Sequence, residues 1–319
     1  MRINKHIVSN GRRLWLWFWR RLMDGFAPSD KDGNYKRPKG FIFDKNFKID
    51  FKTNESLYLL LGETCPWCHR TLLITELKKL SDIKKIYLQA NLKNGEWIFK
   101  NNYFKNKTLT DLYKKADKGK FLRATVPLLL KTNKNEVELI SNESSEIIEI
   151  LNLISNREDE NILKIEQCEN DILNIIHNDI NNGVYKCGFA RNQDCYAKAS
   201  NKLFEGLCII DELIKKYGGP WIFGDKLTYA DIYLFPTIIR WELIYSKLFK
   251  CTEKEISEFR NILRWRLNFF ELDGVSETCF ESKWLREYYR GLFPLNPNQL
   301  IPLQPNLKEI LERDINLLF

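Results

Sequence analysis

The distribution of apolar and polar positions predicts regular structure from about residue 56 onward. Residues 56–61 form a short apolar run that ends at Gly62, and this length and boundary are typical of a buried strand. Leucines then recur at helical spacing, which predicts an amphipathic helix over residues 66–81. A second strand is expected near residues 83–89. The order strand, helix, strand is a typical beginning of an α/β domain.

Two more strands are predicted before the chain changes character. Residues 125–130 and 137–140 are rich in leucine and β-branched residues, and the polar stretch 132–136 between them is interpreted as a turn. A helix is expected to begin within residues 141–145. Residues 91–121, rich in Asn and Lys, are interpreted as an inserted surface excursion. These elements together predict a small α/β domain.

The second half of the chain is predicted to be all-helical, because after about residue 157 the apolar positions follow helical spacing only. Within it, Thr228 and Asp231 stand where a helix capping box places its two side chains, which indicates a structural role for both. The expected organisation is an N-terminal extension over 1–50, an α/β domain over 51–156 and a helical domain over 157–319.

The net charge of +8 is concentrated at the beginning of the chain. Residues 1–40 contain ten Lys or Arg and three Asp, whereas the remaining residues carry 40 Lys or Arg against 39 acids. A nucleic-acid-binding surface needs cations clustered across a folded face, so this distribution disfavours one. The 319 residues are 44% hydrophobic and 29% charged, which is typical of a globular protein of about two domains.

Residues 1–50 are predicted to be an irregular extension, rich in charge and turn signals. Within it, residues 14–19 read Leu-Trp-Leu-Trp-Phe-Trp between two pairs of arginines. This run is too short for a secretion signal, and no stretch of about 20 uncharged apolar residues predicts a membrane span. Two interpretations of this aromatic and basic segment remain. Either residues 12–21 contact an anionic membrane surface, or the aromatic segment folds back onto the protein, and the second is favoured.

The cysteine usage favours a reducing compartment. Eight cysteines are present and no export signal is recognised, so reduced thiols and a cytoplasmic location are expected. Cys65 and Cys68 form a close pair. The other six stand singly among apolar neighbours, where cysteine is usually a packing residue, at positions 168, 187, 195, 208, 251 and 279.

The close pair lies in the sequence Cys65-Pro66-Trp67-Cys68-His69, which permits three interpretations. A haem attachment site needs export and a second axial ligand, and the chain offers only two Met and two other His residues. A structural zinc site needs a further pair of ligands, which the sequence lacks. The pattern therefore favours a nucleophilic or redox thiol, with neither metal nor haem.

The position of Cys65 favours a reactive thiolate. The predicted strand delivers Cys65 to the start of the predicted helix, where free backbone N–H groups and the helix dipole lower the pKa of a thiol. Cys68 lies one turn further along. It is either a resolving thiol that attacks a mixed disulfide on Cys65 or a small packing residue, and both interpretations stay open.

Two later segments favour a thiol ligand with an α-amino acid end. Thr125-Val126-Pro127 fits the cis-proline loop of a thioredoxin-like arrangement, in which Val126 turns its backbone toward a thiol compound. In Asn142-Glu143-Ser144-Ser145, the amides and the Ser144 hydroxyl suit a carboxylate, and Glu143 suits an ammonium group. The γ-glutamyl end of glutathione carries both groups. An ordinary capped helix has the same sequence, and only the order of the motifs favours glutathione.

In this order the motifs resemble the Xi class of glutathione transferases, the glutathionyl-hydroquinone reductases, over most of residues 25–305. The resemblance rests on Cys65-Pro66-Trp67 with His69-Arg70-Thr71, Thr125-Val126-Pro127, residues 142–148, residues 181–186 with 188–190, Ala230-Asp231 leading to Arg240, and Tyr288-Tyr289 with Asn296-Pro297. It implies an α/β thioredoxin-like domain followed by an all-α glutathione-transferase domain, and a homodimer.

The resemblance also implies a reaction and a set of site residues. Glutathione is the implied co-substrate, and Cys65 is implied to take glutathione from a glutathionyl-hydroquinone as a mixed disulfide. Four residues are implied to bind glutathione: Trp97, Val126, Glu143 and Ser144. Three are implied to contact the aromatic substrate: Tyr185, which is also implied to be catalytic, Tyr288 and Tyr289. The family commonly has Ala where this chain has Cys68. A glutaredoxin-like dithiol oxidoreductase using Cys65 and Cys68 is therefore the alternative.

Overall fold

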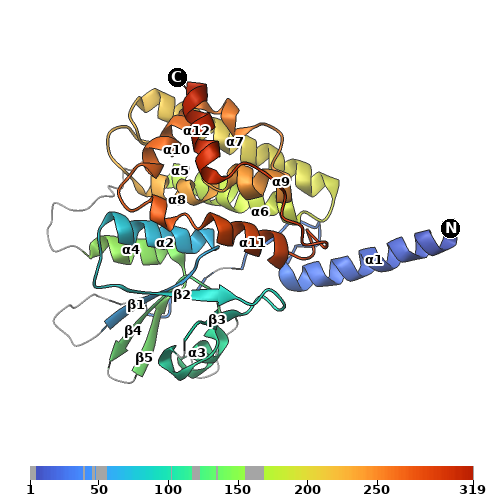
Figure 1. Ribbon diagram of the computed structural model, residues 1–319, viewed down its shortest axis with the longest axis horizontal. Helices are drawn as coiled ribbons and strands as arrows, with labels where there is room; N and C mark the ends of the chain where they lie inside the picture. Colours follow the sequence, from blue (N-terminus) through green and yellow to red (C-terminus); the bar gives the residue numbers. More distant parts are fainter. Residues whose placement is uncertain are drawn as a thin grey trace.

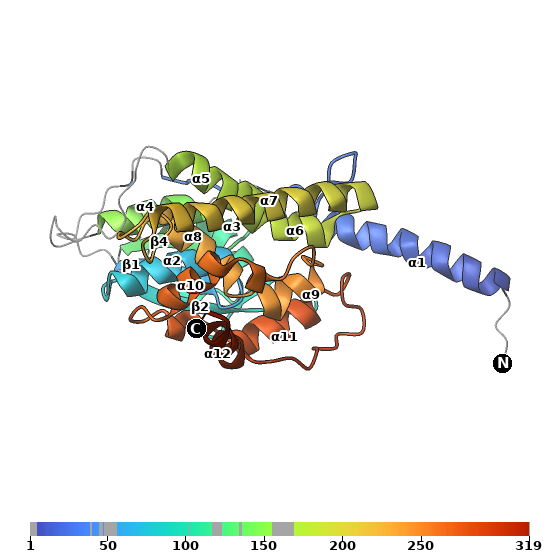
Figure 2. The same cartoon turned by 90° about the horizontal axis from the view of Figure 1, so that it is seen from above.

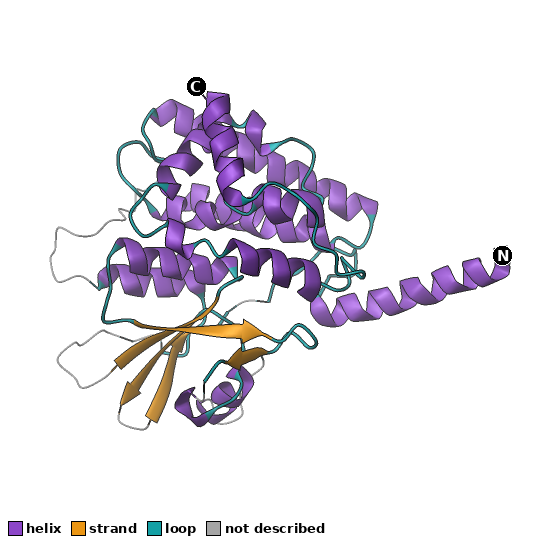
Figure 3. Cartoon of the chain, viewed as in Figure 1, coloured by secondary structure: helices purple, strands orange, loops and turns teal. Residues whose placement is uncertain are grey.

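A mixed β-sheet with helices on both faces lies beside a larger helical layer (Figures 1 and 3). This computed structural model describes residues 5–38, 40–44, 47, 56–101, 103–116, 123–133, 136–154 and 169–318. The predicted domain boundary near residues 156 and 157 and the predicted packing residue Cys168 lie outside the described residues. The architecture confirms the predicted fold class, a thioredoxin-like α/β domain followed by a helical domain.

The sheet has five strands in the order β3-β2-β1-β4-β5. They are β1 (Ser56–Gly62), β2 (Lys84–Ala90), β3 (Trp97–Phe99), β4 (Leu128–Asn133) and β5 (Glu136–Ser141). β1 and β2 are parallel, and the other pairs are antiparallel. In the central strand Leu60 pairs with Ile86 and Leu128, and all three are buried. Burial on both faces explains why β1 is a continuous apolar run.

Helices α2 (Pro66–Leu77) and α4 (Ser144–Leu153) lie between the sheet and the helical domain (Figure 1). The helix predicted over 66–81 ends four residues earlier than expected, because Lys79 takes a left-handed φ of 53°. The Lys79 and Leu80 N–H groups then donate to Glu76 O and Thr75 O, which is a Schellman ending. Leu80 packs back on the core from outside the helix, so its helical spacing was misleading.

The segment 91–121, interpreted from the sequence as a surface excursion, contributes regular structure to the domain. It contains β3, the short turn η1 (Tyr103–Lys105) and helix α3 (Leu109–Ala116). β3 extends the sheet, and α3 buries Leu109, Leu112 and Tyr113 completely or nearly so. A strand of three residues is too short to produce a periodic signal, and the many Asn and Lys residues around α3 hide its apolar side.

Apart from an isolated bridge between Trp221 and Gly224, every regular element within residues 169–318 is a helix, which confirms the prediction from spacing. The helices of this part are α5 (Glu169–Ile175), η3 (Ile176–Asn181), α6 (Asn182–Phe189), α7 (Gln193–Tyr217), α8 (Tyr229–Ile238), η4 (Trp241–Tyr245), α9 (Ser246–Leu248), η5 (Ile256–Glu258), α10 (Arg260–Phe270), η6 (Ser276–Thr278), α11 (Glu281–Gly291) and α12 (Leu307–Leu318).

Asp231 is a buried structural residue, as its place in the predicted capping box indicated. Its Oδ2 accepts hydrogen bonds from the backbone N–H and the hydroxyl of Thr228, each at 2.8 Å. Its Oδ1 accepts from the Ile222 N–H at 3.0 Å and from Trp265 Nε1 at 2.7 Å. One carboxylate therefore fixes the start of α8, the preceding loop and α10.

His69 joins the two domains through a buried polar contact. Arg240 donates to His69 Nδ1 at 2.8 Å, and His69 Nε2 lies 2.8 Å from Thr278 Oγ1. Burial, with the nearby Arg240 charge, holds the pKa of His69 well below its usual value, so the ring is neutral. Because arginine only donates, the ring proton sits on Nε2 and is donated to Thr278. Both ring nitrogens are thus occupied, and His69 acts as a structural residue.

Residues 5–26 form a helix, contrary to the expected irregular extension. Helix α1 (Lys5–Phe26) projects away from the body of the protein (Figures 1 and 2). Met23 is buried and Trp19 Nε1 donates to Pro294 O at 2.8 Å, but the earlier aromatic side chains are exposed. The favoured interpretation, that this aromatic segment folds back onto the protein, holds for Trp19 and is wrong for residues 14–18. No described helix is both long enough and apolar enough to cross a membrane.

Candidate active site

Cys65 lies between β1 and α2, at the N-cap position of the helix. Its backbone is extended (φ −72°, ψ 120°), and Pro66 follows as the first helical residue. Proline is favoured there because the first helical N–H has no partner within the helix. The local sequence thus places a partly exposed thiol against the positive end of α2.

The surroundings of Cys65 favour its thiolate. Burial alone raises the pKa of this thiol, but hydrogen bonds from the Cys68 thiol and from the Cys68 N–H act against it, as does the Arg37 charge. Together these groups lower the pKa of Cys65 from 9.0 to about 7. About half of the thiols are then ionised near neutral pH.

Cys68 is held inside the protein. It is 2% exposed, and its Sγ accepts a hydrogen bond from the Gly62 N–H at 3.2 Å. Burial and the neighbouring Cys65 raise the pKa of Cys68 well above its usual value. Cys68 is therefore a protonated donor to Cys65, and it lines neither of the cavities that meet at Cys65.

A charged cleft of about 450 Å³ lies on one side of the Cys65 thiol. Four of the predicted site residues line it: Cys65, Trp97, Val126 and Glu143. The Val126–Pro127 peptide bond is cis, as predicted, and the Cys65 thiol points to Val126 O at 3.8 Å. The cleft therefore brings together the Cys65 thiol, the Val126 backbone and the Glu143 carboxylate.

Glu143, the N-cap residue of helix α4, lines this cleft, whereas the predicted site residue Ser144, the first residue of the helix, is not among the lining residues. Glu143 Oε2 accepts from the Gly40 N–H at 3.3 Å, and its Oε1 accepts from Ser145 Oγ at 3.3 Å. Ser144 is 2% exposed, and its Oγ has no hydrogen-bond partner among the described residues. A buried hydroxyl without a partner, next to a helix N-terminus, is suited to an anionic group.

Two arginines complete the cleft, and sequence reasoning missed both. Arg37 stacks its guanidinium over Trp67, 3.2 Å from the ring centroid, and Arg123 lies on the cleft wall. Burial lowers the pKa of Arg37, although the nearby Cys65 and Glu143 act against this. No local pattern marks Arg37, because residue 37 belongs to a segment that reaches the cleft only through the tertiary fold.

An aromatic cavity of about 430 Å³ lies on the other side of Cys65. It shares five lining residues with the charged cleft: Tyr35, Cys65, Trp67, Trp97 and Arg123. It adds side chains of the helical domain and of the end of α1, namely Tyr185, Phe189, Tyr288 and Phe26. The thiol therefore lies where a charged space and an aromatic space meet.

The tyrosines of the aromatic cavity form a hydrogen-bonded chain. The hydroxyls of Tyr185 and Tyr288 are 2.6 Å apart, and Tyr245, which sequence reasoning missed, lies 3.2 Å from Tyr288. Burial raises the pKa of both Tyr185 and Tyr288 well above the usual value, so these phenols stay protonated. Tyr289 is not brought to the cavity, since its hydroxyl donates to Leu243 O at 3.0 Å.

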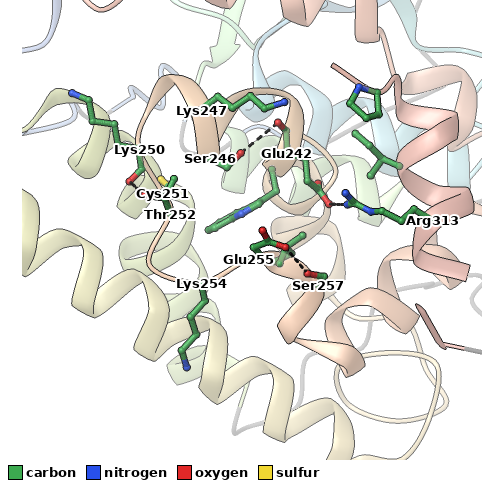
Figure 4. Close-up of a pocket in the computed structure, with 14 residues that line it drawn as sticks. Glu242, Ser246, Lys247, Lys250, Cys251, Thr252, Lys254, Glu255, Ser257 and Arg313 are labelled. Carbon is green, nitrogen blue, oxygen red and sulfur yellow. Dashed lines mark hydrogen bonds and ion pairs between the residues drawn. The ribbon is translucent and has the colours of Figure 1, made fainter. Parts of the chain in front are cut away.

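A third cavity, of about 660 Å³, lies within the helical domain (Figure 4). Glu242 and Arg313 form an ion pair at its edge at 3.2 Å, and Ser257 donates to Glu255 at 3.2 Å. Its lining contains neither Cys65 nor the tyrosine chain. The candidate active site is therefore the paired charged cleft and aromatic cavity.

Family models match both parts of the fold. The model described as the N-terminal domain of glutathione S-transferase matches residues 64–153, and the C-terminal domain model matches residues 193–267. The matched residues begin at the loop that carries Cys65 and include α4. A thioredoxin-like sheet with its thiol at a helix start, followed by this helical domain, defines a glutathione transferase.

Individual relatives show to which class of glutathione transferases the chain belongs. The chain is 31% identical over 293 residues to glutathionyl-hydroquinone reductase YqjG of Escherichia coli, covering 86% of this chain and 85% of that protein. The glutathione-bound structure of YqjG matches with a TM-score of 0.71 over 82% of this chain and 89% of that one. The glutathione S-transferase Xi of Phanerochaete chrysosporium matches with a TM-score of 0.75 at 27% identity, over 85% and 97%. The chain belongs to the Xi class of glutathione transferases, the family of the glutathionyl-hydroquinone reductases.

Proposed function

We propose that this protein is a glutathione-dependent reductase of glutathionyl-hydroquinones, with Cys65 as its nucleophile. The observation that carries the proposal is a thiol with a pKa of about 7 at the meeting point of a charged cleft and an aromatic cavity. A substrate that joins a charged peptide to an aromatic ring by a sulfur atom fits both spaces at once. The name of the Escherichia coli relative, glutathionyl-hydroquinone reductase YqjG, supports the same substrate class.

Glutathione occupies the charged cleft in this proposal. Glu143, which lines the cleft, binds its α-ammonium group. The first turn of α4, where the buried Ser144 hydroxyl has no hydrogen-bond partner among the described residues, binds its α-carboxylate. The Val126 backbone, whose carbonyl faces Cys65, pairs with the peptide, and Trp97 packs against it. Arg123 supplies a charge for the glycine carboxylate at the other end of the ligand.

The reaction begins with attack of the Cys65 thiolate on the sulfur of the glutathionyl-hydroquinone. A sulfur–sulfur bond forms and the sulfur–aryl bond breaks, with its electron pair passing to the ring carbon. That carbon takes a proton, and free hydroquinone leaves. A second glutathione, as thiolate, attacks the glutathionyl sulfur of the mixed disulfide, which releases oxidised glutathione and restores the Cys65 thiolate.

The tyrosine chain supplies the proton in this scheme. Tyr185 lines the aromatic cavity as Cys65 does, and its hydroxyl is hydrogen-bonded to Tyr288 at 2.6 Å. Because burial keeps both phenols protonated, Tyr185 can donate to the ring carbon, and Tyr288 hydrogen-bonds to the phenolate that results. The phenolate regains the proton that the second glutathione releases when its thiol ionises.

The alternative, a dithiol oxidoreductase, uses Cys68 as a resolving thiol. Only one observation favours it, the hydrogen bond between the two cysteine thiols. The burial of Cys68 and the raised pKa of its thiol oppose it, since a resolving thiol must ionise to attack. Variants of both cysteines separate the two functions.

The activity is expected to rise with pH through about pH 7. The reacting form is the thiolate and the pKa of Cys65 is about 7, so kcat/KM falls about tenfold per pH unit below this value and levels off above it. The measurement is the release of menadiol from glutathionyl-menadiol across this pH range. A profile that is flat between about pH 5 and pH 9 contradicts the assignment.

Alkylation of Cys65 by iodoacetamide provides a control that needs no turnover. Its rate is expected to follow the same pH curve, and Cys68 stays unmodified because it is buried. In the Arg37→Met variant the curve moves to higher pH, because the Arg37 charge lowers the pKa of Cys65. An unmoved curve would show that Arg37 does not act on the thiol.

Removing the hydroxyl of Tyr185 or Tyr288 is expected to slow the reaction. Tyr185→Phe and Tyr288→Phe each keep the ring and lose the proton donor or its partner, so kcat falls by about a hundredfold. The matched control is Tyr289→Phe, whose hydroxyl bonds to Leu243 O outside the cavity, and its kcat stays near that of the unmodified protein. Equal loss in all three variants contradicts proton donation by Tyr185 and indicates a packing effect.

A further inference from the structure

Helix α1 exposes large apolar side chains along most of its length. It has 22 residues, which corresponds to about 33 Å at 1.5 Å per residue, and it projects from the body (Figure 2). Leu14 is 58% exposed, Trp15 48% and Phe18 50%. A soluble surface rarely displays so many neighbouring apolar groups without a partner.

These side chains form one continuous face of the helix. At 100° per residue the following positions fall within a single stripe: Ile7, Leu14, Trp15, Phe18, Trp19 and Leu22. The stripe begins to be buried near the last turns, where Trp19 reaches Pro294, and it continues uncovered toward Lys5 among the described residues. Contact with the body therefore uses only one end of a longer apolar face.

The opposite face is cationic. Arg13 and Arg20 project from it, beside Leu16, and Arg12 and Arg21 lie at its two borders with the apolar stripe. The first acidic residue of the helix is Asp24, in its last turn. Trp17 also lies on the cationic face, with Arg21 over its ring at 5.8 Å.

This combination identifies the partner by its chemistry. An apolar face rich in tryptophan beside a face of arginines matches the boundary between lipid headgroups and acyl chains of an anionic bilayer. A second copy of the same helix is a poorer partner, because it would cover the apolar face and leave the arginines of both copies without a counter-charge, Asp24 being the only acidic residue of α1.

We propose that α1 binds the surface of an anionic phospholipid bilayer, with its tryptophan-rich face among the lipid headgroups and its arginines toward the phosphates and water. Gly25 and Phe26, at the end of α1, line the aromatic cavity together with Cys65. A bilayer-bound α1 therefore holds the cavity close to the membrane surface, where hydrophobic aromatic molecules concentrate. The binding itself does not depend on the proposed reaction.

Flotation of the full chain with vesicles tests the proposal. The protein is expected to float with phosphatidylcholine vesicles that contain phosphatidylglycerol, and much less with pure phosphatidylcholine. Trp15→Ser and Trp17→Ser form a matched pair, because both residues are exposed tryptophans on opposite faces. Trp15→Ser is expected to weaken binding about tenfold, while Trp17→Ser keeps most of it.

Charge variants and salt test the electrostatic part. The double variant Arg13→Gln with Arg20→Gln is expected to bind about 25-fold more weakly, at about fivefold per arginine. Binding of the unmodified protein is expected to fall when salt is raised.

Three results overturn the proposal: no flotation with anionic vesicles at low salt, equal losses in the two tryptophan variants, or equal binding to neutral and anionic vesicles. Self-association through the apolar face of α1 would also overturn the proposal. If Trp15→Ser lowers the oligomeric state in sedimentation without lipid, the face is a contact between copies of the chain. Circular dichroism and thermal unfolding of each variant confirm that the fold is retained.

Discussion

Cys65→Ser is expected to abolish the release of hydroquinone from glutathionyl-menadiol, lowering kcat by at least about a thousandfold. A serine hydroxyl at the start of α2 is not ionised near neutral pH, so the group that attacks sulfur is lost. The Cys65 thiol, in contrast, has a pKa of about 7 and lies in both cavities. The measurement is turnover of the purified variant beside the unmodified protein, with free menadiol separated from its glutathione conjugate.

Cys68→Ser is the matched control. The serine hydroxyl keeps an acceptor for the Gly62 N–H and a donor toward Cys65, so the local fold is preserved. Most of the turnover on glutathionyl-menadiol is expected to remain. A glutathionylated peptide assayed with both variants distinguishes the alternative, because a dithiol cycle fails when Cys68 is replaced. Near-normal turnover of Cys65→Ser contradicts the proposed function altogether.

The second large effect concerns stability. Asp231→Ala is expected to lower the free energy of unfolding by about 3–5 kcal/mol. The substitution leaves the N–H groups of Ile222 and Thr228 and the indole of Trp265 without their acceptor inside the protein. Because these groups belong to the loop before α8, its first turn and α10, the loss spreads across the helical domain. Urea unfolding followed by circular dichroism measures it.

Asp231→Asn provides the control for this prediction. The amide oxygen still accepts from Ile222 and Trp265, whereas the amide nitrogen meets the Thr228 N–H as a second donor. Its loss is expected to lie between those of the alanine variant and the unmodified protein. An alanine variant as stable as the unmodified protein would mean that water replaces the carboxylate, and the structural role would then be wrong.

Short-range patterns were sufficient to predict much of the fold. The apolar run of β1, the start of α4 and the capping box at Thr228 each depend on residues close in sequence. The location of Cys65 at a strand-to-helix turn follows from the same local signals. The cis bond before Pro127 was predicted because it is tied to a recognisable order of motifs.

Features that depend on distant contacts were missed. β3 has too few residues for an alternation of apolar and polar positions to be recognised. It forms a strand because it pairs with β2. Arg37 reaches the cleft because the segment after α1 crosses the body to Trp67. Helix α1 was missed for a different reason: its residues were expected to be irregular, and a run of aromatic residues predicts burial without identifying what covers it.

The shared position of Cys65 in two cavities fixes an order of events in the proposed cycle. While the thiol carries glutathione as a mixed disulfide, the charged cleft is full, and the remaining approach to the sulfur is through the aromatic cavity. The hydroquinone must therefore depart before the second glutathione enters. The two half-reactions then proceed as a ping-pong sequence in which the covalently loaded protein is an obligatory intermediate.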